Sequence, residues 1–157
     1  YGDIEKNPKT FRHYMDGITP LVSEKMMQMD AERVDTGKKL GLDLMPIMDQ
    51  LKMYYGHNLT ETIYEYANSP ESPYKDIVGH SVRSRYLTED VPFCMVPCKL
   101  IGEKAGQPMP VVDLVIRLAS FLHDRDYVVQ GHGLEKLGLD DMTLEELKEY
   151  ARTGKVS

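Results

Sequence analysis

The sequence has no run of about 18 apolar residues, which is the length that a membrane-spanning helix needs. It also shows no recognisable signal peptide. Basic side chains are not in excess, because the formal net charge at pH 7 is −6. A chain without a basic patch has no electrostatic footprint for nucleic acid or for an anionic membrane surface. We therefore expect neither nucleic acid nor a membrane among its partners.

Cysteine is scarce, because the 157 residues include only two, Cys94 and Cys98. Their spacing of four places both on one face of a helix, where a disulfide between them would have poor geometry. A zinc site would need further ligands close by, so we expect no metal. We predict two reduced thiols that face a core, as suits a cytoplasmic protein.

Strand-like alternation of apolar and polar residues is missing over any useful length, and there are no repeats or low-complexity segments. The length suits one domain. At this size about two thirds of the unfolded surface can be buried, which is enough for an independent core. We predict one soluble helical domain over residues 1–157, with an all-α bundle fold.

Capping residues, prolines and glycines predict where the helices begin and end. Residues 1–16 show no strong period and are expected to be irregular. The predicted helices run from Thr19-Pro20 to Gly41, from Pro46 to Tyr55, from a Thr60 cap to the residue before Pro70, from about Val96 to Lys104, onward from Pro108, and from the capping box Thr143–Glu146 to Gly154. The helix after Pro108 is apolar almost all round, which is typical of a central helix.

Residues 79–92 (GHSVRSRYLTEDVP) are the most unusual stretch, because they concentrate charge without an apolar period. Such a stretch is either a site or a salt-bridged surface turn. Pro92 disfavours helix at Val91, so we expect this piece to be extended or turned. Arg85 carries a planar fork that can hold a carboxylate through two hydrogen bonds. Asp90 could orient a histidine as a general acid and base.

The octapeptide at residues 85–92 resembles the signature of the opine dehydrogenases, the octopine/nopaline dehydrogenase family. Shorter pieces fit the helical domain of the same family: Gly79-His80, Gly17-Ile18-Thr19-Pro20, Asp30-Ala31-Glu32-Arg33, Pro97, Ala105-Gly106, Pro108, Pro110 and Leu134–Leu139. The resemblance implies that Arg85 binds or polarises a keto acid and that Asp90 pairs with a catalytic histidine. Tyr86 and His80 are expected beside the substrate.

The resemblance covers only part of such an enzyme. In this family a nucleotide-binding half with a glycine-rich turn comes first, and the catalytic histidine lies in an Asn-Pro-x-x-His-Pro-like segment between the halves. Neither occurs here, because Asn7-Pro8 is not followed by His-Pro. The resemblance therefore implies a C-terminal helical domain. Its cofactor, NAD or NADP, would be bound mainly by an N-terminal nucleotide-binding domain, and its substrates would be an amino acid and a 2-keto acid.

Two other classes stay open. All-helical metal phosphohydrolases place a His, a His-Asp pair and a distant Asp around divalent cations, and His80, His123-Asp124 and Asp140 follow that order. A helix-end charge cluster is the simpler explanation of His123-Asp124. A non-catalytic helical module that forms a homodimer is the third class, and it is compatible with the first.

Overall fold

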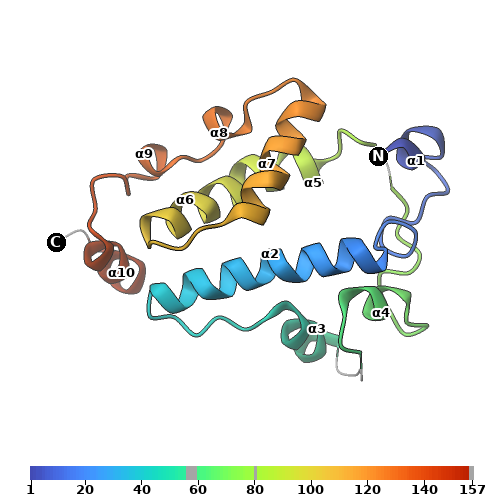
Figure 1. Cartoon of the computed structure of the whole chain (residues 1–157), viewed down its shortest axis with the longest axis horizontal. Helices are drawn as coiled ribbons and strands as arrows, with labels where there is room; N and C mark the ends of the chain where they lie inside the picture. The colour runs from blue at the N-terminus through green and yellow to red at the C-terminus, as the bar shows by residue number, and fades with distance from the viewer. Residues whose placement is uncertain (56–59, 80, 156–157) are drawn as a thin grey trace. The chain divides into compact units, whose positions relative to one another are not determined.

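The computed structural model describes residues 1–55, 60–79 and 81–155. Within these ranges the chain is helical and has no strand beyond an isolated bridge between Arg12 and Val78, so the all-α prediction is confirmed. The elements in chain order (Figure 1) are α1 (Gly2–Lys6), α2 (Pro20–Lys39), α3 (Ile47–Tyr55), α4 (Ile63–Asn68), α5 (Arg85–Thr88), the π-helix η1 (Val91–Met95), α6 (Val96–Lys104), α7 (Pro110–His123), α8 (Tyr127–Gln130), α9 (Leu134–Leu137) and α10 (Leu144–Thr153). In the described part of the chain, no helix is long and apolar enough to cross a membrane.

The chain divides into two compact units. The first comprises Tyr1–Ala31 and Met45–Ser84, and the second comprises Glu32–Leu44 and Arg85–Ser157. Helix α2 contributes residues to both. The single domain expected over residues 1–157 stays a prediction.

Helix α2 begins and ends where the sequence predicts. The Thr19 hydroxyl accepts a hydrogen bond from the Val22 N–H at 3.2 Å and so caps the first turn. Gly41 has φ +76°, which a residue with a side chain rarely adopts, and it lies just past the last turn. Leu21 and Val22, in its first turn, are exposed.

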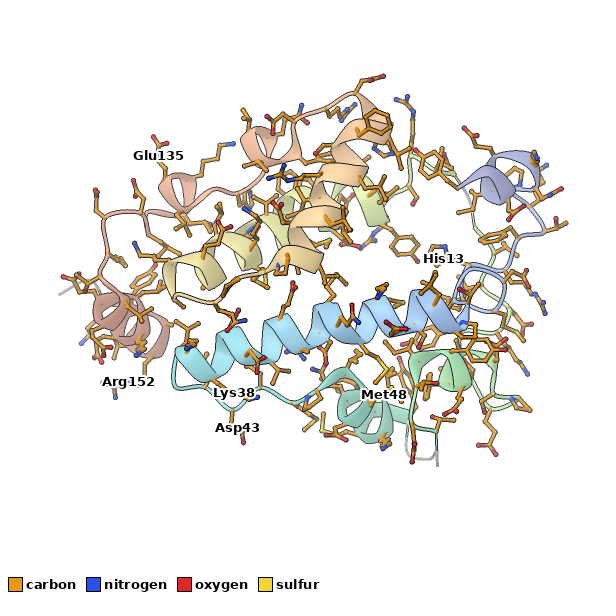
Figure 2. The ribbon with its side chains drawn as sticks, viewed as in Figure 1. His13, Lys38, Asp43, Met48, Glu135 and Arg152 are labelled. Atoms are coloured by element: carbon orange, nitrogen blue, oxygen red, sulfur yellow. The ribbon has the colours of Figure 1, made fainter. Side chains whose placement is uncertain are left out.

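The first unit is built around a small apolar core. Its buried members are Ile18, Met48, Ile63, Tyr66 and Ala67. Met48 lies on α3 (Figure 2), and Met26 and Met27 of α2 pack against this core.

Two predicted details of the first unit are wrong. The cap of α4 is Thr62 and not Thr60, because Glu65 three residues later completes a capping box with Thr62. Residues 2–6 form the short helix α1, within the range that was expected to be irregular, and none of its residues is buried.

The second unit packs η1, α6, α7, α8, α9 and α10 around its own core. Its apolar members include Val91, Val96, Val112, Ile116, Tyr127, Leu139 and Leu147. Gly102 allows a close approach here, since a Cβ at this position would lie 2.9 Å from the Thr36 hydroxyl and also clash with Met109. The structure confirms α6 and α10 with their predicted limits.

Helix α7 is less central than predicted. Val112, Ile116 and Ala119 are buried on one face. Leu114, Leu118 and Phe121 are 64%, 52% and 78% exposed on another. The prediction of an all-round buried helix is therefore wrong, and α7 carries an apolar stripe that the described chain does not cover.

Two acidic residues of α2 hold the first turns of other helices. An Asp30 oxygen accepts the Ile47 N–H of α3 at 2.8 Å. The buried Glu32 carboxylate accepts the N–H groups of Val111 and Val112 in α7 at 2.8 and 3.0 Å. Both carboxylates satisfy N–H groups that a helix start leaves without partners. The Asp-Ala-Glu-Arg segment therefore has a structural role.

Candidate functional site

The charged stretch folds differently from the predicted turn. Residues 85–88 form α5, and η1 and α6 continue the helical path to Lys104. The Glu89 N–H donates to the Arg85 carbonyl at 2.8 Å, and the Phe93 N–H donates to the Glu89 carbonyl at 2.9 Å. The extended or turned backbone expected around Val91 is therefore wrong, although Pro92 is responsible for an irregularity of another kind.

That irregularity is the π-turn η1. The Val96 N–H donates to the carbonyl of Val91, five residues back, instead of to that of Pro92. Pro92 and Pro97 have no N–H to donate, so a regular α-helical ladder cannot form across this segment. π-turns within helices occur frequently at functional sites. This one begins immediately after Asp90.

Arg85 lies at the start of α5 with 74% of its side chain exposed. Its Nε atom is 3.7 Å from a Glu89 carboxylate oxygen, and Glu89 is itself 59% exposed. An ion pair in this setting is worth about 0–1 kcal/mol. The guanidinium is therefore accessible and only loosely held, as a group that receives a carboxylate must be.

Asp90 is half-buried between α5 and η1. It occupies the N-cap position of η1, but its side chain makes no capping hydrogen bond, because its backbone is helical and the N–H groups ahead are already bonded. Tyr86, 41% exposed, is four residues earlier and so lies on the same helix face. The structure brings Arg85, Tyr86 and Asp90 onto one short helical segment. His80 and His57 lie outside the described residues.

A loop after α8 packs against this segment. The His132 N–H donates to the Pro92 carbonyl at 3.0 Å, and the His132 ring lies 4.7 Å from the Phe93 ring, centroid to centroid. In the sequence His132 stands between two glycines, Gly131 and Gly133. No local pattern links it to Phe93, so sequence reasoning missed this pair.

The other histidine considered, His123, is buried. Its Nδ1 atom lies 2.6 Å from the Tyr127 hydroxyl, and Asp124 adopts a left-handed backbone conformation at the end of α7. In the described ranges, no three His, Cys, Asp or Glu side chains converge as metal ligands would. The phosphohydrolase alternative gains no support, and the helix-end explanation of His123-Asp124 fits.

The two thiols are free, and Cys94 is exposed while Cys98 is half-buried. The prediction that both face a core is therefore wrong for Cys94. Burial raises the pKa of the Cys98 thiol.

A tyrosine cluster occupies the first unit. Tyr14 stacks on Tyr74 with ring centroids 4.6 Å apart, the Tyr55 and Tyr74 hydroxyls are hydrogen-bonded, and these rings adjoin Tyr66. A cavity of about 180 Å³ beside Tyr14, Tyr66 and Tyr74 is otherwise lined by aliphatic side chains. Burial raises the pKa of both Tyr66 and Tyr74. These phenols are thus held protonated and serve packing better than acid and base chemistry.

Comparison with known families supplies a direct match. The family model described as NAD/NADP octopine/nopaline dehydrogenase, alpha-helical domain, matches residues 1–123.

Individual relatives agree with that match. The chain is 37% identical over 134 residues to a protein named opine dehydrogenase from Arthrobacter sp. (strain 1C), covering 85% of this chain and 37% of that protein. It is 30% identical over 132 residues to vitopine synthase of Allorhizobium ampelinum, covering 84% and 35% respectively. The chain thus spans little more than a third of the length of these relatives.

Proposed function

The chain belongs to the octopine/nopaline dehydrogenase family as its alpha-helical domain, and on that premise we propose that it forms the substrate-binding part of an NAD(P)-dependent opine dehydrogenase. The whole enzyme would condense the amino group of an amino acid with the carbonyl of a 2-keto acid, losing water to give an imine. Reduction of the imine carbon, with a proton added to nitrogen, then gives a secondary amine that carries two carboxylates.

The observation that carries this proposal is the segment from Arg85 to Asp90. Arg85 presents an accessible guanidinium that would bind the keto-acid carboxylate in a fork. Asp90 presents a half-buried carboxylate that the helix does not use for capping. It would accept the ring N–H of a catalytic histidine from the other part of the enzyme, fix its orientation and stabilise its protonated form. Tyr86, and His80 outside the described residues, would contact the substrate.

The nicotinamide cofactor belongs to the absent part in this proposal. The sequence has no Gly-x-Gly-x-x-Gly motif, and residues 1–55, 60–79 and 81–155 hold no strand that could lead into a glycine-rich turn, which is how a dinucleotide pyrophosphate is usually held. When bound, NADH or NADPH supplies the hydride. We expect residues of this chain to orient the substrates against it, and we expect the chain by itself to be inactive.

A homodimer is the second partner that we propose. The exposed stripe of Leu114, Leu118 and Phe121 follows helical spacing along α7. Contiguous exposed apolar surface often marks an interface. A two-fold axis across α7 would lay the stripes of two copies against each other. The same helix would thus pair with a second copy of itself.

We assign the enzyme to the cytoplasm. The free thiols of Cys94 and Cys98 support this, because reduced cysteines are the rule in that compartment.

An activity assay tests the proposed function. A full-length protein that carries this domain should oxidise NADH or NADPH only when an amino acid and a 2-keto acid are both present, and the product should be a secondary amine by mass spectrometry. The 157-residue chain alone should fold, with a helical circular dichroism spectrum, and show no such activity. Turnover with the keto acid alone would identify a simple ketone reductase and refute the proposal.

A further inference from the structure

The π-turn leaves one backbone carbonyl available. In a regular α-helix the Pro92 carbonyl would accept the Val96 N–H, but Val96 donates to Val91 instead. Pro97, the next residue in line, has no N–H. The Pro92 carbonyl accepts the His132 N–H at 3.0 Å, so the loop around His132 is fixed to the helix two residues after Asp90.

The same loop is held from its other side. The Lys136 ammonium donates to the carbonyls of Val129 at 3.0 Å and of Gly131 at 2.9 Å. Gly131 lies so close to η1 that a Cβ there would clash with the Pro92 carbonyl oxygen and lie 2.8 Å from that of Tyr127. The backbone of His132 is thus anchored on both sides, while its side chain is exposed.

The imidazole of His132 is placed beside the candidate site. It packs on Phe93 with ring centroids 4.7 Å apart. Phe93 lies within η1, three residues after Asp90, so the imidazole packs on the segment that begins directly after Asp90. The neighbouring cation Lys136 is already engaged by backbone carbonyls. An exposed, hydrogen-bonding ring on an anchored backbone is how a binding residue is presented.

We propose that His132 binds the second carboxylate of the reacting pair, the one that Arg85 does not hold. This inference rests on the proposed function, in which the amino acid and the keto acid each bring a carboxylate. A protonated imidazole donates a charge-assisted hydrogen bond to such a group. The Phe93 ring packs against the imidazole, so the position of the imidazole is fixed before substrate binds. His132 lies beyond residues 1–123, the range that the family model matches.

Steady-state kinetics of the full-length enzyme tests the assignment. His132→Gln replaces the imidazole by an amide that cannot carry a charge, and should raise KM for one of the two substrates by on the order of tenfold or more, the size of a lost charge-assisted hydrogen bond. Because the bond exists before and during reaction, kcat should stay within about twofold. His132→Lys restores a cation and should recover most of the affinity. Glu135→Gln on the neighbouring helix α9 (Figure 2) is the control and should leave both KM values unchanged.

Each outcome bears on one claim. If His132→Gln melts at a lower temperature but keeps both KM values, the residue only braces the loop and the inference is wrong. The inference is also wrong if KM for that substrate is no lower in His132→Lys than in His132→Gln. If Arg85→Lys raises KM while His132→Gln does not, the proposed function stands and this inference falls. If the unmodified enzyme reduces no imine, the proposed function itself is wrong.

Discussion

The side chains of Arg85 and Asp90 contribute little to the stability of the fold. The Arg85–Glu89 ion pair is exposed, and pairs of that kind contribute about 0–1 kcal/mol. Asp90 caps no helix. Neither side chain is part of the apolar core of its unit. Substitution of either one can therefore be interpreted through catalysis with little interference from stability.

The first prediction concerns these two residues in the full-length enzyme. Asp90→Asn keeps the size of the side chain but removes its charge, so the catalytic histidine that we propose as its partner would lose a stabilising carboxylate. We expect kcat to fall by on the order of a hundredfold or more, the usual worth of positioned acid and base catalysis. Arg85→Lys keeps a charge but loses the planar fork, so KM for the keto acid should rise more than it does in Asp90→Asn.

Thermal melts accompany those kinetics. Both variants should melt close to the unmodified enzyme, because the two side chains contribute little to the fold. Normal turnover with a lowered melting temperature would mean that Arg85 and Asp90 only brace the helix, and the catalytic assignment would be lost.

Glu32, in contrast, is expected to contribute to the stability of the second unit. Its carboxylate is buried and accepts two N–H groups at the start of α7. Glu32→Ala leaves both donors without a partner, so we predict a loss of about 2–3 kcal/mol in the free energy of unfolding. Urea denaturation measures it. Glu24→Ala on the same helix removes an exposed carboxylate that pairs with Lys25 and should leave the denaturation midpoint unchanged.

At the scale of helices, the sequence predicts the features that depend on neighbouring residues. It does not predict those that depend on packing between distant parts of the chain. The limits of α2, α3, α6 and α10 follow from caps, prolines and glycines that act within a turn, and these were predicted correctly. The helical path through residues 85–95 was not, because a π-turn accommodates two prolines that would break an α-helix. The exposed stripe on α7 was also missed, since composition alone cannot tell which apolar face will be covered.

The candidate site divides in the same way. Arg85 and Asp90 stand in a contiguous motif and could be chosen from the sequence. His132 and Phe93 are 39 positions apart, and they meet because a proline carbonyl is left free by backbone geometry. No periodicity encodes that contact.

The capping box of α10 gives a prediction with a pH dependence. The Thr143 hydroxyl donates to a Glu146 oxygen at 2.7 Å, and the Thr143 N–H donates to it at 2.8 Å. These bonds hold the Glu146 pKa below its ordinary value of 4.5. The stabilisation is therefore present above that ordinary value and is lost as the pH falls through the lower, folded-state pKa.

Thr143→Ala should accordingly destabilise the chain by about 1 kcal/mol at pH 7. The difference from the unmodified chain should shrink as the pH falls below the ordinary value of 4.5 and through the lowered pKa of Glu146. Denaturant melts at several pH values measure it. Thr153→Ala, at the other end of α10, is the control. A pH-independent difference for Thr143→Ala would show that the Glu146 half of the box contributes nothing.

At the scale of the whole molecule, the apolar stripe on α7 predicts self-association. We expect light scattering to give a dimer mass for the full-length enzyme. Leu118→Glu should shift it to a monomer, because a charge in the middle of the stripe opposes burial. Leu137, on α9, is also an exposed leucine, and Leu137→Glu should leave the dimer intact. A monomer mass for the unmodified enzyme at micromolar concentration would remove the homodimer from the proposal.

The π-turn has a geometric effect that reaches beyond its own five residues. A residue added to one turn of an α-helix rotates everything after it by about 100° relative to everything before it. A helical wheel drawn continuously from Arg85 to Lys104 therefore misplaces one end against the other. The helical turns that carry Arg85 and Asp90 are therefore rotated about the helix axis relative to the packed side of α6. The deletion of Cys94, which lies within η1 but outside the candidate site, would remove this rotation and turn Arg85 and Asp90 relative to the packed side of α6, while leaving every side chain of the site in the sequence.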